Sequence, residues 1–273
     1  MIGAIVGDIA GSRFEFCNHK SKDFELLAKD CFFTDDTIVT LALAKAVLLS
    51  GVDYEDLSTL AVQQMRKIGG AYLDYPGASF GERFGMWLYF GKPEPYNSFG
   101  NGAAMRISVA GDVARNIEEC KWLSKTLTEV THNHPEGLKG AEAVAAAIFL
   151  AKNGMSKENL KAYISENYYA MDFSLDQIRE SYTFDVSCQG SVPQALMSFF
   201  ESTDFEDAIR NAISIGGDSD TIGAICGSVA GAYYGVPAAI KNRALGFLDE
   251  RLLNIYEEFE MSKGQFMVLQ HSE

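Results

Sequence analysis

Two short acidic motifs hold the side chains best suited to chemistry. The first is Phe33-Thr34-Asp35-Asp36-Thr37, and the second is Gly216-Gly217-Asp218-Ser219-Asp220-Thr221. Each places two carboxylates and a threonine hydroxyl directly before an apolar stretch typical of a buried helix. Mg²⁺ and Mn²⁺ prefer carboxylate, hydroxyl and water oxygens as ligands. The motifs therefore predict a site for hard divalent cations, provided that the fold brings them together.

Charge counting indicates how many cations such a site would hold. The aspartates of the two motifs carry four negative charges, which two divalent cations would neutralise. Without cations, carboxylates about 4 Å apart repel each other by about 4 kcal/mol per pair at an effective dielectric constant of about 20. The sequence thus predicts either two bound cations, Mg²⁺ or Mn²⁺, or carboxyl groups with raised pKa values.

Helix capping is the main alternative for both motifs. Thr34 or Asp35 could cap a helix that starts near Thr37, and Asp218 could cap one that starts near Thr221. Capping needs only one side chain per motif, so the second carboxylate favours metal binding.

Zinc is disfavoured because thiols and imidazoles do not cluster. The second motif also resembles the nucleophile motif of haloacid-dehalogenase-type phosphatases, but the Rossmann-like sheet of that family is not predicted here.

The elements that must position these motifs are predicted to be helices. Helical patterns occupy residues 37–49, 55–67, 103–115, 139–152, 157–166, 192–201, 205–215 and 238–260. Asp204 is expected to cap the helix over 205–215. The opening IGAIVG is expected to begin a helix, because no βαβ rhythm follows it and no alternating strand pattern occurs elsewhere. We therefore predict an all-α fold.

Two further segments bear on this fold. Every fourth residue of the helix expected over 221–235 is a glycine, namely Gly223, Gly227, Gly231 and Gly235. Glycine weakens a helix, so the stripe predicts close contact with a second helix. Residues 69–102 form the longest irregular stretch, and irregular segments of that length in compact domains are usually functional.

Composition limits the possible classes of function. Apolar residues make up 47% of the 273 residues, which suits one compact domain over 1–273. The net charge of −14 argues against binding to duplex nucleic acid. Five cysteines without a CxxC pair argue against a disulfide framework and favour the cytoplasm. Neither a signal peptide nor a membrane span is predicted.

Taken together, the motifs resemble those of the ADP-ribosylglycohydrolase family, which includes dinitrogenase-reductase-activating glycohydrolase. The resemblance covers nearly the whole chain, and the order and spacing of the motifs make it specific. The matching segments are residues 7–11, 14–16, 34–37, 98–106, 131–132, 205–208 and 216–221.

The resemblance implies a compact multi-helix orthogonal bundle with a central cleft that holds two Mg²⁺ or Mn²⁺ ions. The family's metal ligands correspond to Thr34, Asp35, Asp36, Asp218, Asp220 and Thr221. Asp220 would bridge the two ions. Glu15 would have a catalytic or gating role beside them, and the alternative for Glu15 is a charge on a helix surface.

The segment 98–106 corresponds to the family's ligand loop. Small residues let a ligand approach the backbone, and a helix N-terminus offers N–H groups to a diphosphate. The implied substrate contacts are Ser98, Phe99, Gly100, Asn101, Gly102, His132 and Gly217. Packing is the alternative role for Phe99, and an ordinary loop position is the alternative for His132. Arg106 is expected to be structural, and Tyr96 is a candidate for the adenine contact.

The implied reaction releases ADP-ribose by hydrolysis at C1″ of the distal ribose. The substrate would be an ADP-ribosylated protein or a small ADP-ribosyl conjugate. Glu15, Asp36 and Asp220 are the expected catalytic residues, because nearby carboxylates can move a proton and stabilise an oxocarbenium-like centre. The alternatives are a metal-dependent phosphatase or phosphodiesterase, and a non-catalytic ADP-ribose-binding protein.

Overall fold

The structure, a computed structural model, describes residues 1–268, and every regular element in that range is helical. The α-helices are α1 (Ile2–Gly11), α2 (Asp35–Ser50), α3 (Leu57–Gln64), α4 (Glu82–Tyr89), α5 (Ser108–Val113), α6 (Ile117–Thr128), α7 (Pro135–Lys152), α8 (Lys157–Asn167), α9 (Leu175–Ile178), α10 (Cys188–Phe200), α11 (Phe205–Ser214), α12 (Ser219–Tyr234), α13 (Ala238–Leu245) and α14 (Glu250–Val268). The predicted all-α fold is confirmed. None of these helices is long and apolar enough to cross a bilayer.

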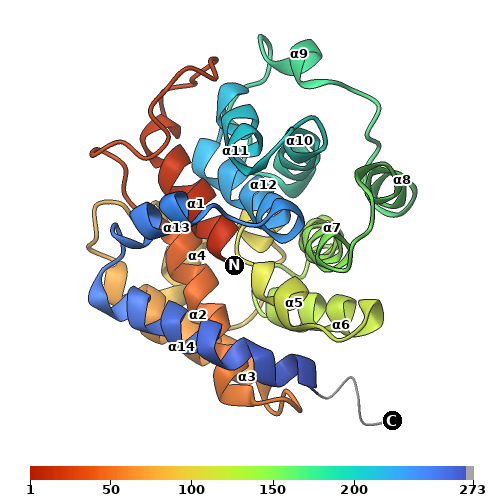
Figure 1. The fold of residues 1–273 in the computed structure, drawn as a ribbon. Coiled ribbons are helices and arrows are strands. Elements are labelled where there is room, and N and C mark those ends of the chain that lie inside the picture. The colour runs from red at the N-terminus through yellow and green to blue at the C-terminus, as the bar shows by residue number, and fades with distance from the viewer. Residues whose placement is uncertain (269–273) are drawn as a thin grey trace.

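Helices α1 and α12 lie side by side at the centre of the bundle (Figure 1). The other face of α12 packs on α7, α10 and α11, while α2 packs on α3 and α14. Buried apolar side chains from Met1 to Phe266 form one connected core. This continuous core supports the expectation of a single domain, which stays a prediction.

Glycine stripes on both central helices allow this close packing. A Cβ atom built on Gly7 would lie 1.9 Å from the carbonyl oxygen of Gly223, and one built on Gly3 would lie 2.0 Å from that of Gly227. These pairings run in opposite directions along the two helices, so α1 and α12 are antiparallel. The close helix contact predicted from the stripe on α12 is confirmed, and α1 supplies a matching stripe that the sequence analysis did not identify.

Gly235 does not belong to the stripe. It follows the end of α12 with a φ angle of +76°, and the position of its Cβ would meet no other atom within 4 Å. A left-handed residue at this position ends a helix, and glycine adopts that conformation without steric cost. The expectation that Gly235 lies on the contact face is therefore wrong.

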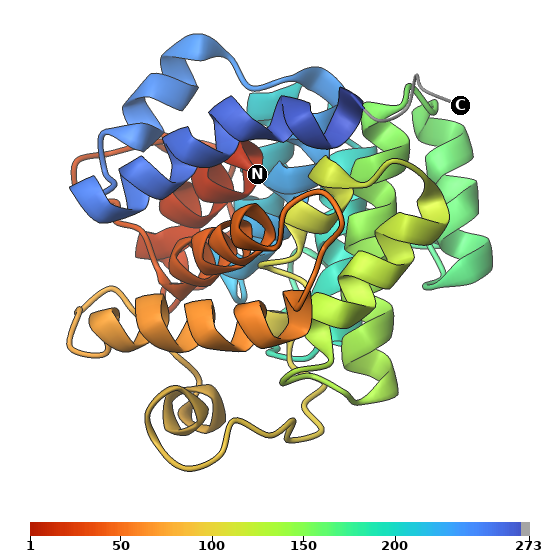
Figure 2. The ribbon, with the colours of Figure 1, turned by 90° about the horizontal axis from the view of Figure 1, so that it is seen from below.

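Three helix predictions also need correction. Residues 238–260 form two helices, α13 and α14, because Asp249 caps a new helix by accepting from the N–H of Leu252 at 2.9 Å. The helix expected over 103–115 is the shorter α5. Helices α4, α6 and α9 were not predicted. Helix α4 lies inside the segment 69–102, which projects from the lower edge of the bundle in Figure 2.

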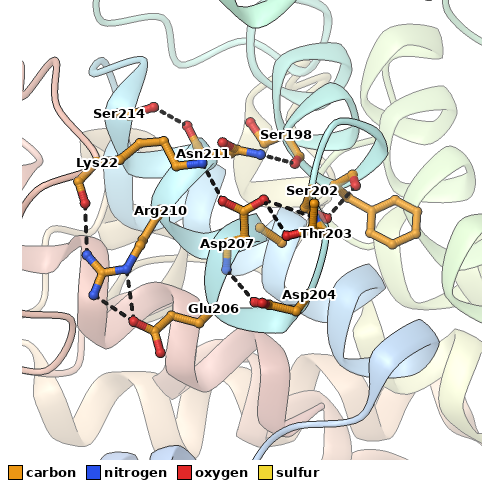
Figure 3. Close-up of polar contacts among 12 residues, drawn as sticks. Lys22, Ser198, Ser202, Thr203, Asp204, Glu206, Asp207, Arg210, Asn211 and Ser214 are labelled. Atoms are coloured by element: carbon orange, nitrogen blue, oxygen red, sulfur yellow. Dashed lines mark hydrogen bonds and ion pairs between the residues drawn. The ribbon is translucent and has the colours of Figure 1, made fainter.

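Charged contacts tie the segment between α1 and α2 to α11 (Figure 3). Arg210 donates to the backbone carbonyl of Lys22 at 2.8 Å and forms an ion pair with Glu206. The Lys22 ammonium pairs with Asp207. Asp204 caps α11 as predicted, accepting from the N–H of Asp207 at 2.8 Å. The segment that carries the predicted catalytic glutamate is therefore held against the helix that leads into the second acidic motif.

Candidate active site

The two acidic motifs lie together although they come from opposite ends of the chain. The hydroxyl of Thr221 donates to Oδ2 of Asp36 at 3.3 Å, which joins the start of α12 to the start of α2. Glu15, Asp218 and Asp220 each place a carboxylate oxygen within 4.8 Å of the other two, and all three residues are buried. Metal binding requires carboxylates that lie this close together. The same arrangement places Glu15 beside the acidic pairs and not on an exposed surface.

The antiparallel pair of α1 and α12 creates this juxtaposition. The end of α1 touches the start of α12, because a Cβ atom on Gly11 would lie 2.3 Å from the carbonyl oxygen of Ser219. The chain then turns directly toward Glu15. One turn earlier on α1, the carboxylate of Asp8 accepts from the backbone N–H groups of Thr34 at 3.0 Å and Thr37 at 3.1 Å. Helix α1 thereby fixes both motifs.

Asp8 is a site-forming residue for which the sequence analysis proposed no role. The available signal was a single carboxylate within an otherwise apolar helix. Its Oδ1 also accepts from the hydroxyl of Thr34 at 2.7 Å, and that hydroxyl in turn accepts from the N–H of Asp36 at 3.2 Å. The capping alternative is thus correct for Thr34. It does not explain Asp218, whose side chain makes no capping hydrogen bond.

A cavity of about 350 Å³ opens above the acidic cluster. Its walls include eleven of the predicted site residues, namely Glu15, Asp35, Asp36, Ser98, Gly100, Asn101, Gly102, His132, Asp218, Asp220 and Thr221. Three predicted residues do not line it. Thr34 is fully buried in its capping contacts, the Phe99 ring lies against that of His134, and Gly217 lies behind Tyr182.

Burial and mutual repulsion strongly perturb the carboxyl groups of the cavity. Burial, together with the charge of Asp218, raises the pKa of Glu15 to about 8. Burial and the charge of Asp8 raise the pKa of Asp35 to about 7. Burial and the surrounding carboxylates also hold the pKa values of Asp36 and Asp220 well above their usual range. Groups with such perturbed pKa values cluster at functional sites.

The donor set fits hard divalent cations. Oδ1 of Asp36 and Oδ1 of Asp220 are buried and have no hydrogen-bond partner among residues 1–268. A buried polar atom without a partner is costly, and a bound cation would supply the missing interaction. The neighbouring ligand atoms are carboxylate and hydroxyl oxygens, as Mg²⁺ and Mn²⁺ require.

The raised pKa values predict how the stability of the cation-free protein depends on pH. A carboxyl group with a raised pKa keeps its proton in the fold and loses it on unfolding, so its stabilising contribution disappears as the pH rises through the folded pKa. For Glu15 this window runs from the ordinary value of 4.5 to about 8. We therefore expect the melting temperature of EDTA-treated protein to fall as the pH rises from 4.5 to about 8.

Calorimetry or circular dichroism at the two pH values measures this effect. Glu15→Gln should make the fall smaller, whereas Glu166→Gln at an exposed position of α8 should leave it unchanged. A melting temperature that rises with pH in the EDTA-treated protein would contradict the argument.

The ligand loop, residues 98–106, forms part of the cavity wall next to the acidic cluster. The N–H of Gly100 donates to the hydroxyl of Ser98 at 3.1 Å, and the backbone of Gly100 pairs with that of Ser187 in an isolated β-bridge. The amide of Asn101 donates to Oδ2 of Asp218 at 2.7 Å and to the hydroxyl of Ser191 at 3.0 Å. Asn101 therefore connects the ligand loop to the acidic cluster and orients one of its carboxylates.

Gly217 is fixed from two sides. Its N–H donates to Oδ1 of Asn18 at 3.2 Å, and a Cβ atom on Gly217 would lie 2.5 Å from the ring of Tyr182. Its φ angle is +76°, so a residue with a side chain would be strained here as well. The predicted contact of Gly217 with substrate stays a prediction, while its contacts show how it shapes the turn before Asp218.

Sequence reasoning missed most of the cavity rim. Arg83 of α4 lines the cavity, donates to the carbonyl of Tyr96 at 2.5 Å and lies over the Tyr96 ring. Phe184 and Val186 line the opposite side and are 47% and 57% exposed. They lie between α9 and α10, where no motif or periodicity distinguishes them. Exposed rim residues without a regular pattern give no signal in a single sequence.

Comparison with known proteins agrees with this geometry. A family model described as ADP-ribosylglycohydrolase matches residues 1–265. An ADP-ribosylarginine hydrolase of Pseudomonas putida is 30% identical over 268 residues, which cover 86% of this chain and 70% of that protein. The human ADP-ribosylhydrolase ARH3 is 23% identical over 348 residues, with 96% of this chain and 93% of that protein covered.

A solved structure shares the fold. A chain of an ADP-ribosylglycohydrolase-related protein complex superposes with a TM-score of 0.67 and 24% identity, and the match covers 96% of this chain and 97% of the other. The resemblance inferred from the motifs is therefore confirmed by a family match that spans almost every residue. On these grounds, the protein belongs to the ADP-ribosylglycohydrolase family.

Proposed function

We propose that this protein is a Mg²⁺- or Mn²⁺-dependent hydrolase that releases ADP-ribose by cleaving the bond at C1″ of the distal ribose. Its family and its relatives indicate hydrolysis of ADP-ribosyl linkages. The observation that carries the finer proposal is the meeting of the two acidic motifs in one cavity, which the glycine-rich ligand loop also lines.

The proposed metal ligands are five of the six residues that the family resemblance implied, namely Asp35, Asp36, Asp218, Asp220 and Thr221. The sixth, Thr34, is left out because its hydroxyl donates to Asp8 and accepts from the N–H of Asp36. Unpartnered oxygens on Asp36 and Asp220 and the donation from Thr221 to Asp36 support this assignment. When bound, the cations would neutralise the carboxylates, polarise the ribose hydroxyls and make a water more acidic.

The side chains of the cavity would divide the remaining work. Glu15 is our preferred group for taking a proton from the attacking water. Its Oε2 accepts a hydrogen bond from Ser79 at 3.2 Å, and its carboxylate faces Asp218 and Asp220. Asp36 is the alternative, but Oδ2 of Asp36 is already engaged by Thr221. Positive charge that develops at C1″ would be stabilised by the surrounding carboxylates.

Next to the acidic cluster, the ligand loop would hold the nucleotide part. Ser98, Gly100 and Gly102 line the cavity, and the two glycines leave room for a diphosphate close to the backbone. The Phe99 ring lies against His134 and does not line the cavity, so the contact of Phe99 with the substrate stays a prediction. The substrate would be an ADP-ribosylated protein or a small ADP-ribosyl conjugate. Five unpaired cysteines support a cytoplasmic location.

Removal of divalent cations is expected to abolish turnover, and addition of Mg²⁺ or Mn²⁺ is expected to restore it. The measurement is release of intact ADP-ribose, by chromatography, from substrates linked through arginine, serine and O-acetyl groups. Far-UV circular dichroism on the EDTA-treated sample checks that the helices persist. Turnover that is insensitive to EDTA would defeat the metal assignment. Release of inorganic phosphate would indicate a phosphatase, and binding without turnover in saturating Mg²⁺ would indicate a binding protein.

A further inference from the structure

Arg106 is a buried cation whose position calls for an explanation. It is 1% exposed, and no ion pair within residues 1–268 includes it. Burying a charge without a counter-ion is expensive, so such a residue is normally paired or functional. Burial lowers the pKa of Arg106 to about 10, which leaves the guanidinium charged at neutral pH. Arg106 also lines the cavity beside the ligand loop.

The contacts of Arg106 converge on one imidazole. One guanidinium nitrogen donates to the hydroxyl of Thr131 at 2.6 Å and lies 3.2 Å from Nδ1 of His132. The Thr131 hydroxyl lies 2.8 Å from the same Nδ1. A guanidinium has only donors, so the contact with Arg106 favours the tautomer in which Nδ1 of His132 accepts and Nε2 carries the proton.

The Nε2–H group of His132 points toward the ligand loop. A Cβ atom built on Gly102 would lie 3.4 Å from Nε2, and one built on Gly100 would lie 3.6 Å from it. The described part of the chain supplies no hydrogen-bond acceptor for Nε2, although the ring is buried. The Nε2–H group of His132 is therefore a neutral donor without a partner. It faces the cavity beside Gly100 and Gly102, which have no side chains.

The cavity is lined by charges of both signs. Four aspartates and Glu15 line it, and so do Arg106 and Arg83 beside His132 and Tyr96. Burial, followed by the charges of Arg106 and Arg83, lowers the pKa of His132 well below its usual range. His132 therefore serves as a neutral donor and not as a second buried cation.

We propose that Arg106, together with Thr131, is a positioning residue that fixes His132 as an Nε2–H donor to the diphosphate of the ligand. This inference rests on the proposed function, because the diphosphate is that of ADP-ribose. A charged donor at Nδ1 disfavours the other tautomer. The His132 ring then needs no change of tautomer or orientation when the ligand enters, which lowers the free-energy cost of binding.

Two measurements test this role on the full-length protein. Nitrogen-15 NMR of histidine-labelled protein at neutral pH reports the tautomer, with the His132 signal assigned by its loss in His132→Gln. Calorimetric titration gives the affinity for ADP-ribose and for adenosine, which lacks phosphate. The variants are Arg106→Met and the nearly isosteric Thr131→Val. Thr131→Val removes the hydroxyl that holds the guanidinium beside Nδ1, and it serves as the test if Arg106→Met does not fold. Ser156→Asn is the control, because Ser156 caps α8 outside the cavity and asparagine also caps helices well.

In the wild-type protein we expect His132 with a bare Nδ1 and a protonated Nε2. In the variants we expect a tautomer mixture and about tenfold weaker binding of ADP-ribose, with adenosine affinity and the control unchanged. A protonated Nδ1 in the wild type, or variants that keep both tautomer and affinity, would overturn this inference and leave the proposed function standing. Failure of the wild-type protein to bind ADP-ribose at all would overturn both.

Discussion

Replacing Asp220 by asparagine is expected to lower kcat/KM for ADP-ribose release at least tenfold. Tenfold corresponds to about 1.4 kcal/mol of transition-state stabilisation. Asp220 is buried at the start of α12, its Oδ1 has no partner, and its other neighbours in the cluster are Glu15 and Asp218. Asparagine keeps the shape but removes the charge and one strong oxygen ligand, so cation affinity should fall together with turnover.

Stability distinguishes this loss of function from simple unfolding. Burial and neighbouring carboxylates raise the pKa of Asp220 well above its usual range, which means that its ionised form is disfavoured in the cation-free fold. In EDTA, the Asp220→Asn protein should therefore unfold at the same temperature as the wild type or higher. If the Asp220→Asn protein is inactive but as stable as the wild type, the activity was lost with the carboxylate and not through unfolding.

Asp204→Asn is the matched control for this substitution. Asp204 caps α11 outside the cavity, and asparagine caps helices about as well as aspartate does. Its turnover should stay close to that of the wild type. Near-normal turnover of Asp220→Asn at limiting Mg²⁺ would remove Asp220 from the metal site and, with it, the proposed bridging role.

The sequence predicted the acidic cluster because its motifs combine local chemistry with fixed spacing. Two carboxylates and a threonine before a helix are more than capping needs, and this excess pointed to a shared site. Neither motif alone shows that the two meet in space. Their meeting depends on the contact between α1 and α12. The sequence pointed to only one side of that contact, the glycines at 223, 227 and 231. The matching glycines at 3, 7 and 11 lie in a short apolar helix, where periodicity is hard to see.

Other parts of the site lay beyond sequence reasoning for physical reasons. Arg106 was expected to be structural, because it lies inside the helix predicted over 103–115. Its complete burial depends on the packing of α4, whose Phe84 ring lies under the guanidinium, and α4 was not predicted. The role of Asp8 likewise depends on hydrogen bonds to a loop more than twenty residues away in the sequence. Tertiary contacts of this kind have no local pattern.

Gly7→Ala is expected to cause the largest loss of stability among single-methyl additions, about 3 kcal/mol or more in the free energy of unfolding. The added Cβ would lie 1.9 Å from the carbonyl oxygen of Gly223 and 2.2 Å from its carbonyl carbon. Both are backbone atoms of a buried helix, so no side chain can rotate away. The two central helices would have to separate along their whole contact, which also loosens the apolar core around them.

Urea denaturation measures this effect, and Gly264→Ala supplies a control of opposite sign. Gly264 lies in α14, and the position of its Cβ would meet no atom within 4 Å. Alanine is the better helix former by about 0.5–1 kcal/mol, so Gly264→Ala should leave the midpoint unchanged or raise it. An unchanged midpoint in Gly7→Ala would mean that α1 and α12 do not approach as closely as described.

The same substitution connects packing to catalysis. Helix α1 ends against Ser219 and carries Asp8, which holds the start of α2, so any shift between α1 and α12 moves the two acidic motifs relative to each other. Turnover of the folded fraction of Gly7→Ala should therefore fall, and cation affinity should fall with it. Activity per folded molecule that equals the wild-type value would mean that the ligands are positioned by their own loops and not by the glycine contact.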